Sequence, residues 1–359
     1  MSADQTTVAR ALPDTGSAAA EAARDRLLAR AGVRIGELLT GERARWPSVH
    51  TTASEPIEVI EALVGSGGKR LRPAFVISGY LAAGGDEAAA GAVVDAAAAI
   101  ELLHAFLLLH DDVFDDSALR RGRPTAHELH ARQHREAGWA GEARRYGEAV
   151  AILAGDLAHG YADRLAGALP GDARRIWSEL REEVLIGQYL DLRAAAESSY
   201  DPRLSRWIAI IKSGRYSIQR PLALGAALAG RPDLIEVFDR FGEVLGEAFQ
   251  LRDDLIDAYG DSAVTGKPAR LDVAGHKMTL LLALAAEQDE QTRQMFAGAE
   301  PDAAELTGLI DRLGVREQVE KHIDDLVAEA GAALDGIELE PGWHSALTRM
   351  AVQVAYRDR

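Results

Sequence analysis

Two short acidic stretches contain the side chains best suited to chemistry. In the first, "HDDVFDD", Asp111 and Asp115 are four residues apart and Asp112 follows Asp111, which gives the pattern D-D-x-x-D. Residues at this spacing lie about 40° apart on one face of a helix. Mg²⁺ commonly takes one or two such carboxylates and completes its shell with water and phosphate oxygens. The stretch therefore predicts a magnesium site.

The same pattern returns in "FQLRDDLID". Here Asp253 and Asp257 share a face, Asp254 lies beside them and Gln250 precedes them by one turn. One such pattern alone is most often a solvated helix surface, but the segment before the first stretch is apolar nearly all round. A further pair, Asp324-Asp325, lacks a third carboxylate, and we interpret it as surface. Two matched clusters predict several Mg²⁺ ions held against a diphosphate.

Basic residues follow or precede both acidic stretches. Guanidinium groups bind phosphate through two parallel hydrogen bonds, and lysines act as point charges. Each one alone is best interpreted as a solvent-facing charge, but their grouping favours two diphosphate sites, one bridged by metal and one held by cations only. The residues are Lys69, Arg70 and Arg72 in "GGKRLRP", Arg120 and Arg121 in "LRRGRPT", and Lys212, Lys267 and Lys277 further on.

The elements that position these residues are predicted to be helices almost throughout. Alanine and leucine dominate, β-branched runs are scarce, and apolar residues recur at helical spacing. The stretch that leads into Asp111 predicts a helix buried in a bundle. The Arg-rich stretch 132–145 is interpreted as a loop. Further helices are expected at 147–168, 172–195, 203–228, 232–258, 276–297, 302–312, 315–334 and 343–356.

No linker divides the chain of 359 residues, and no fixed-period repeat occurs in it. These features predict one large all-α domain over residues 21–359, preceded by a mobile tail over residues 1–20.

Composition excludes several classes of function. The net charge of −16 argues against a nucleic-acid partner, which would need a basic face. The absence of cysteine excludes disulfides, thiolate metal sites and a cysteine nucleophile, and it fits a reducing compartment. No secretion signal is evident, and the best apolar run, "TLLLALAA", is far shorter than the ~20 residues of a membrane span. We therefore expect a soluble, cytoplasmic protein without stable membrane insertion.

These motifs resemble those of the all-trans polyprenyl diphosphate synthases, most closely the geranylgeranyl diphosphate synthases. From about residue 55 onward the chain carries, in the family's order, "GGKRLRP", "LLHxxxLLHDDxxDD" with "LRRGRPT", "GQYLDL", "FQLRDDLID" and "GKPxxxD…HKMT". The resemblance implies a single large antiparallel helical bundle around a deep central cavity, the isoprenoid synthase fold. It also implies a Mg²⁺-dependent, head-to-tail condensation of isopentenyl diphosphate with allylic diphosphates, three Mg²⁺ ions per active site, and a homodimer.

The resemblance also implies roles for individual residues. The metal ligands would be Asp111, Asp112, Asp115, Asp253, Asp254 and Asp257, which count as catalytic together with Lys212 and Arg120. Isopentenyl diphosphate would be bound by Lys69, Arg72, His104 and Arg121. The allylic substrate would be bound by Arg120, Lys212, Ser213, Gln250, Lys267 and Lys277. Without the resemblance, His104 would be interpreted as a satisfied core histidine. Ser213 stands where the family often has threonine, and it keeps the hydroxyl.

Product length should depend on residues that precede the first aspartates. Ideal geometry puts Leu107 roughly 6 Å and Leu103 roughly 12 Å below Asp111, and turns Phe106 about 140° away from it. In the family, however, a bulky aromatic five residues before the first aspartate resembles the geranylgeranyl-forming type, and Phe106 occupies that position. The resemblance favours geranylgeranyl diphosphate, with farnesyl or longer diphosphates as alternatives.

Two other functions are less favoured. A terpene cyclase shares the all-α fold and one D-D-x-x-D, but its second metal motif is normally of the N/D-x-x-x-S/T-x-x-x-E type, and "GGKRLRP" would serve no purpose there. A non-catalytic subunit of a heteromeric synthase typically loses aspartates, and this chain keeps both sets.

Overall fold

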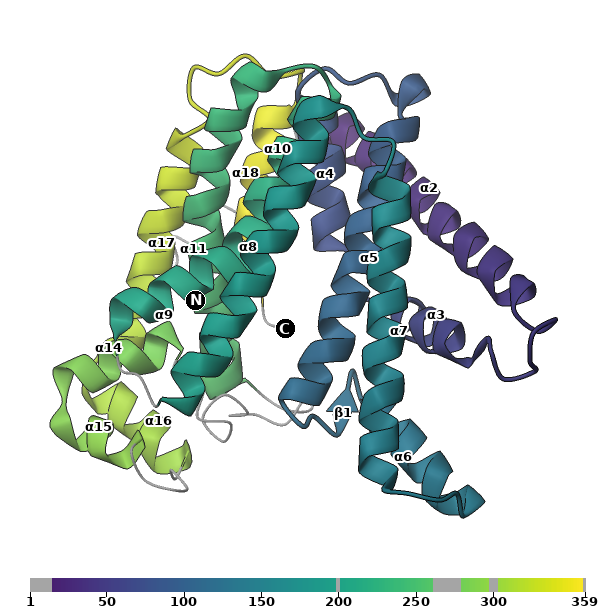
Figure 1. Cartoon of the computed structure of the whole chain (residues 1–359). Helices are drawn as coiled ribbons and strands as arrows, with labels where there is room; N and C mark the ends of the chain where they lie inside the picture. The colour runs from purple at the N-terminus through teal and green to yellow at the C-terminus, as the bar shows by residue number, and fades with distance from the viewer. Residues whose placement is uncertain (1–14, 198–200, 261–278, 297–302, 358–359) are drawn as a thin grey trace. The chain divides into compact units, whose positions relative to one another are not determined.

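Helices make up nearly all of the regular structure in the computed structural model, which describes residues 15–197, 201–260, 279–296 and 303–357 (Figure 1). Among these residues the strands are β1 (Leu119–Arg120) and β2 (Arg123–Pro124), which pair antiparallel. The prediction of an all-α protein is confirmed. The chain divides into two compact units: the first contains 25–77 and 88–170, and the second contains residues up to 24, 78–87 and 171 onward.

The first unit is built around a helix that is buried along most of its length. This helix, α5 (Gly91–Phe114), buries alanines, valines and leucines on nearly every side, and it lies beside α7 (Ala143–Ala166) (Figure 1). Small side chains along α5 and α7 allow this close packing. The other elements with residues in this unit are α2 (Thr15–Arg45), α3 (Glu55–Gly65), α4 (Leu71–Ala82), η1 (Glu87–Ala89), the β1–β2 hairpin and α6 (Ala126–Ala137).

The second unit contains the later helices. They are α8 (Gly171–Ala196), α9 (Pro202–Ile208), the π-helix η2 (Ala209–Gln219), α10 (Arg220–Leu228), η3 (Pro232–Leu234), α11 (Ile235–Tyr259), α14 (Leu280–Gln288), α15 (Glu290–Phe296), α16 (Ala303–Arg312), α17 (Val315–Ala332) and α18 (Trp343–Ala355). Glycines bring three of them close together. A Cβ on Gly214 of η2 would lie 2.8 Å from the Cα of Gly246 on α11, and one on Gly187 of α8 would lie 3.2 Å from Lys212.

Most predicted helices are found, with two corrections. The Arg-rich stretch 132–145 is not all loop, because α6 continues to Ala137 and buries His127, His130 and His134 at helical spacing. The prediction considered the arginines and overlooked that buried face. The helix predicted over 276–297 is two helices where it is described, because Asp289 separates α14 from α15. The Asp289 carboxylate accepts a hydrogen bond of 2.8 Å from the Thr292 amide, as an N-cap does.

The predicted tail boundary at residue 20 falls inside α2, which begins at Thr15. Ser17 and Ala20 are buried, and Ser17 accepts a hydrogen bond of 2.5 Å from Arg349. Burial of these small residues explains why the helix starts earlier than the sequence suggested.

One described helix, α5, is apolar and long enough to span a membrane by length and composition, with a mean hydropathy of 2.0 over its most apolar window. The expectation that no segment reaches this length is therefore wrong. The stretch was predicted as a buried helix but was not counted as a possible span, although Asp95 and Glu101 are too few charges to offset its apolar residues. Because 67% of that window is buried inside the protein, α5 has the exposure of a core helix.

Candidate active site

The first acidic cluster, Asp111, Asp112 and Asp115, lies where α5 ends. Asp112 is 3% exposed, whereas Asp111 and Asp115 are partly exposed. Burial raises the pKa of Asp112, and the guanidinium of Arg120 opposes that shift. The Nη2 of Arg120 lies 2.5 Å from Asp112 Oδ1 and 3.5 Å from Asp111 Oδ2. The cluster therefore has a cation built in beside it.

The β1–β2 hairpin positions that cation. After α5 the chain turns at Asp116, which has a left-handed φ of 48°, and again at Arg121 and Gly122, with φ of 52° and 73°. The two strands pair Arg120 with Arg123. This reversal turns Arg120 back towards the aspartates, eight residues after Asp112. The hairpin therefore explains why the charges along "DDSALRRGR" change from negative to positive: Arg120 folds back beside the aspartates.

A group of basic residues and one acid forms around α4 and α5. The Nη1 of Arg72 lies 3.2 Å from His104 Nε2. Burial lowers the pKa of His104 well below its usual value, and Arg72, Arg121 and Arg120 lower it further, so the ring is neutral and can accept the Arg72 hydrogen bond. Arg121 Nη1 donates to Ser66 Oγ at 2.9 Å. Three of the four residues assigned to isopentenyl diphosphate, namely Arg72, His104 and Arg121, therefore lie close enough for their charges to influence one another.

Glu101 is a member of this group that the sequence reasoning missed. Burial raises its pKa, and Arg72, Arg70 and Arg121 counter the shift. A lone carboxylate inside an apolar helix shows no spacing pattern; only its position three residues before His104 would have pointed to it. Lys69 is exposed and lies just before the left-handed Arg70, which has φ 45°.

The second acidic cluster, Asp253, Asp254 and Asp257, lies near the end of α11. Asp254 is 2% exposed, and it accepts hydrogen bonds from Gln250 Nε2 at 2.8 Å and from the Leu281 amide at 3.4 Å. Asp253 and Asp257 are partly exposed, and Asp253 forms an ion pair with Arg357. In both clusters, therefore, the middle aspartate is buried and hydrogen-bonded, and the first and third reach solvent.

Lys212 and Ser213 lie in the π-helix η2. Lys212 Nζ donates to Asp191 Oδ2 at 2.6 Å. Asp191 belongs to the "GQYLDL" motif, in which the sequence reasoning assigned no residue. A π-helical segment inside an α-helix is uncommon and is frequent at functional sites. Lys267 and Lys277, also assigned to the allylic substrate, lie outside the described residues.

Phe106 is buried against α7. Its ring stacks on His159 with centroids 4.9 Å apart and meets the His110 ring edge-on at 4.6 Å. Leu103 is 1% exposed, whereas Leu107 is partly exposed. The three residues assigned to chain length thus have different surroundings, and Phe106 is held by aromatic neighbours on both sides.

The donor chemistry of the two clusters fits magnesium. Both offer only carboxylate oxygens, the hard ligands that Mg²⁺ prefers, and both keep two aspartates open to water and to a phosphate. The buried middle aspartate of each cluster is fixed by its own hydrogen bonds, and such hydrogen bonds orient the side chains of a metal site.

Comparison with known proteins gives consistent matches. The family model described as polyprenyl synthetase matches residues 55–311. A short chain isoprenyl diphosphate synthase of Methanothermobacter thermautotrophicus is 31% identical over 89% of this chain and 96% of its own. A geranylgeranyl diphosphate synthase of Mycobacterium tuberculosis is 35% identical over 75% of each chain.

Among solved structures, a geranylgeranyl pyrophosphate synthase of Corynebacterium glutamicum, complexed with isoprenyl diphosphate and magnesium, superposes with a TM-score of 0.84. It is 33% identical, and the match covers 94% of this chain and 98% of that one.

Proposed function

Because the chain belongs to the polyprenyl synthetase family and is a prenyltransferase, we propose that it joins isopentenyl diphosphate head to tail to allylic diphosphates, with Mg²⁺ as cofactor. The observation that carries this proposal is the matched burial of the two acidic clusters. Each has a buried middle aspartate and partly exposed first and third aspartates. A solvated helix surface has no reason to repeat that pattern.

The chain's own cations would hold the two substrates. Bound Mg²⁺ supplies charge stabilisation for the departing diphosphate. Arg120 and Lys212 are suited to bind the same allylic diphosphate. In this structure each forms an ion pair with a carboxylate, and the phosphate oxygens would replace that carboxylate when the substrate binds. Arg72 would bind isopentenyl diphosphate, and the neutral His104 ring would orient its guanidinium. No protein nucleophile is needed, since the isopentenyl double bond attacks the allylic cation.

Proton loss and water exclusion complete the reaction. After the new carbon–carbon bond forms, one proton must leave, and the released diphosphate is a sufficient base for it. The allylic cation must be kept from water. The apolar residues that precede Asp111 on α5, Leu107 and Leu103 among them, are suited to that task.

Homodimeric assembly, a cytoplasmic location and a single functional domain over 21–359 are also part of this proposal.

We propose geranylgeranyl diphosphate as the main product, with Phe106 as the residue that limits chain length. Phe106→Ala removes a ring packed on His159 and His110, so the product is expected to lengthen. Leu103→Phe adds a ring on the side of α5 that ideal helix geometry turns towards Asp111, and it is expected to shorten the product. Chromatography of the dephosphorylated products measures both. An unchanged product from Phe106→Ala would make Phe106 an ordinary core residue.

A further inference from the structure

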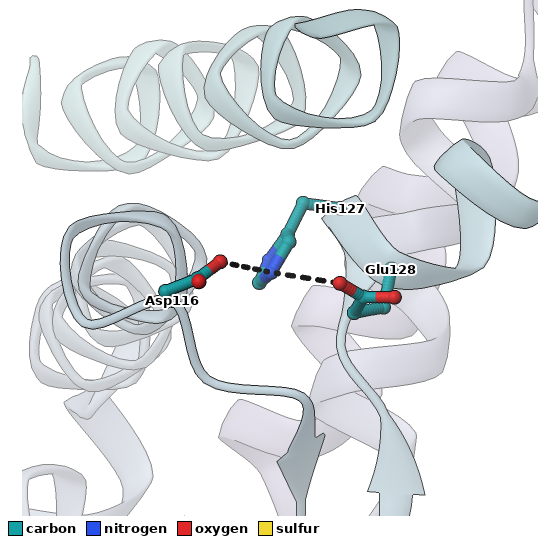
Figure 2. A group of neighbouring side chains, drawn as sticks. All are labelled: Asp116, His127 and Glu128. Atoms are coloured by element: carbon teal, nitrogen blue, oxygen red, sulfur yellow. Dashed lines mark ion pairs between the residues drawn. The ribbon is translucent and has the colours of Figure 1, made fainter. Parts of the chain in front are cut away.

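Three residues outside the proposed active site bring metal-binding atoms together at the base of the β1–β2 hairpin. They are Asp116, which follows α5, and His127 and Glu128, which lie in the first turn of α6 (Figure 2). Their ligand atoms all lie within 4.8 Å of one another. His127 Nε2 is 4.0 Å from Asp116 Oδ1 and 3.9 Å from Glu128 Oε1. Figure 2 shows the imidazole between the two carboxylates.

The His127 ring is the observation that separates this group from an ordinary acidic surface. Its side chain is 2% exposed, yet neither ring nitrogen has a hydrogen-bond partner within the described part of the chain. Buried polar atoms in native proteins nearly always have a partner, so an exception calls for an explanation such as an ion. The ring directs Nε2 at the two carboxylates, and a cation between them would satisfy that nitrogen.

The three ligands differ in rigidity in a way that suits metal binding. The His127 backbone is fixed, because a Cβ on Gly147 of α7 would collide with its carbonyl oxygen, so α7 packs directly against it. Asp116 and Glu128 are 81% and 41% exposed, so their carboxylates are free to adjust. Donors around a tetrahedral ion with bonds of about 2.1 Å lie roughly 3.4 Å apart. The two distances from His127 Nε2 exceed this by about half an ångström, and the separation of the two carboxylates, at most 4.8 Å, exceeds it by no more than about 1.4 Å. Rotation of the two exposed carboxylate side chains can close these gaps.

From this geometry we propose that Asp116, His127 and Glu128 bind a divalent transition-metal cation of the Zn²⁺ or Co²⁺ type. Imidazole nitrogen favours such borderline cations, whereas Mg²⁺ prefers oxygen alone. The site is therefore chemically distinct from the two all-carboxylate clusters. Water would complete the shell on the exposed side.

The cation would have a structural role. Asp116 and His127 close a loop that contains the hairpin with Arg120 and Arg121. A metal that joins the two ends of a loop removes conformational freedom from the chain between them. It would hold the hairpin that directs Arg120 towards Asp112. This role does not depend on the reaction proposed above.

Titration of the full chain with Co²⁺ in saturating Mg²⁺ tests the proposal. Magnesium fills the carboxylate clusters, so Co²⁺ is expected to bind at one equivalent, with visible d–d absorption and a rise in the thermal unfolding temperature. Glu128→Gln is expected to weaken Co²⁺ binding at least about tenfold. His127→Asn is expected to abolish the absorption.

Two controls make the test specific. His130→Asn removes another buried histidine of α6, one already hydrogen-bonded to Gln133 at 2.9 Å, and should leave Co²⁺ binding unchanged. Asp253→Asn alters the second acidic cluster and should also leave it unchanged. Because His127 is buried, the exposed Glu128 variant decides the matter if His127→Asn fails to fold. No Co²⁺ binding in excess Mg²⁺, or the same affinity in Glu128→Gln, would overturn the proposal and leave His127 as an imidazole held by two carboxylates.

Discussion

Asp111→Ala and Asp253→Ala are each expected to lower turnover by a factor on the order of 10²–10³ or more, with helicity retained. Both aspartates are the partly exposed first members of their clusters, so their removal takes away a proposed metal ligand without opening the core. Steady-state rates at saturating substrates, with circular dichroism of each variant, measure the effect. Calorimetric titration with Mg²⁺ and inorganic diphosphate should show weakened binding in both.

Asp325→Ala is the matched control for these variants. Asp325 belongs to an adjacent aspartate pair on α17, but its side chain is 64% exposed and pairs only with Lys321 among the described contacts. Its replacement should leave turnover within about twofold, since an exposed ion pair contributes little. Near-normal turnover in either Asp111→Ala or Asp253→Ala would refute the two-cluster metal site.

Lys212→Ala is expected to raise the KM for the allylic substrate ten- to hundredfold and to change the KM for isopentenyl diphosphate little. Arg72→Ala is expected to show the opposite pattern. A hydrogen bond to a charged group contributes about 1.5–3 kcal/mol, which corresponds to these factors. Kinetics with each substrate varied in turn separate the two effects.

Lys321→Ala serves as the control for Lys212→Ala. Both lysines form an ion pair of 2.6 Å with an aspartate, but Lys212 lies in the π-helix and is 24% exposed, whereas Lys321 lies on the surface of α17. Loss of Lys321 should change neither KM. If Lys212→Ala and Arg72→Ala affect the same substrate, the assignment of two separate diphosphate sites fails.

Local pattern was sufficient to predict the buried helix α5 and the helical register of both acidic clusters. The D-D-x-x-D spacing depends only on helix geometry, and α5 shows its apolar surface on every side. The middle aspartates also behave alike in the structure, with Asp112 and Asp254 buried. The sequence reasoning assigned all six aspartates as metal ligands alike, and it could not show that Asp112 and Asp254 are buried while their neighbours are partly exposed.

Contacts between distant residues account for what the sequence could not show. Lys212 lies in a π-helix whose Gly214 packs closely against Gly246 of α11, a contact that no local pattern encodes. Arg120 reaches Asp112 through the turn at Asp116, whose left-handed φ is rare outside glycine. Likewise, the group of Asp116, His127 and Glu128 forms only once the hairpin brings α5 and α6 together. Neither "DDVFDD" nor "TAHELH" indicates it alone.

Incubation of the protein with labelled isopentenyl diphosphate, Mg²⁺ and dimethylallyl, geranyl or farnesyl diphosphate tests the central claim most directly. Chromatography of the dephosphorylated products should show label in longer prenyl alcohols, with geranylgeraniol predominant, and chelation of Mg²⁺ should abolish its incorporation. Label that remains in isopentenol with every primer would contradict the proposed condensation.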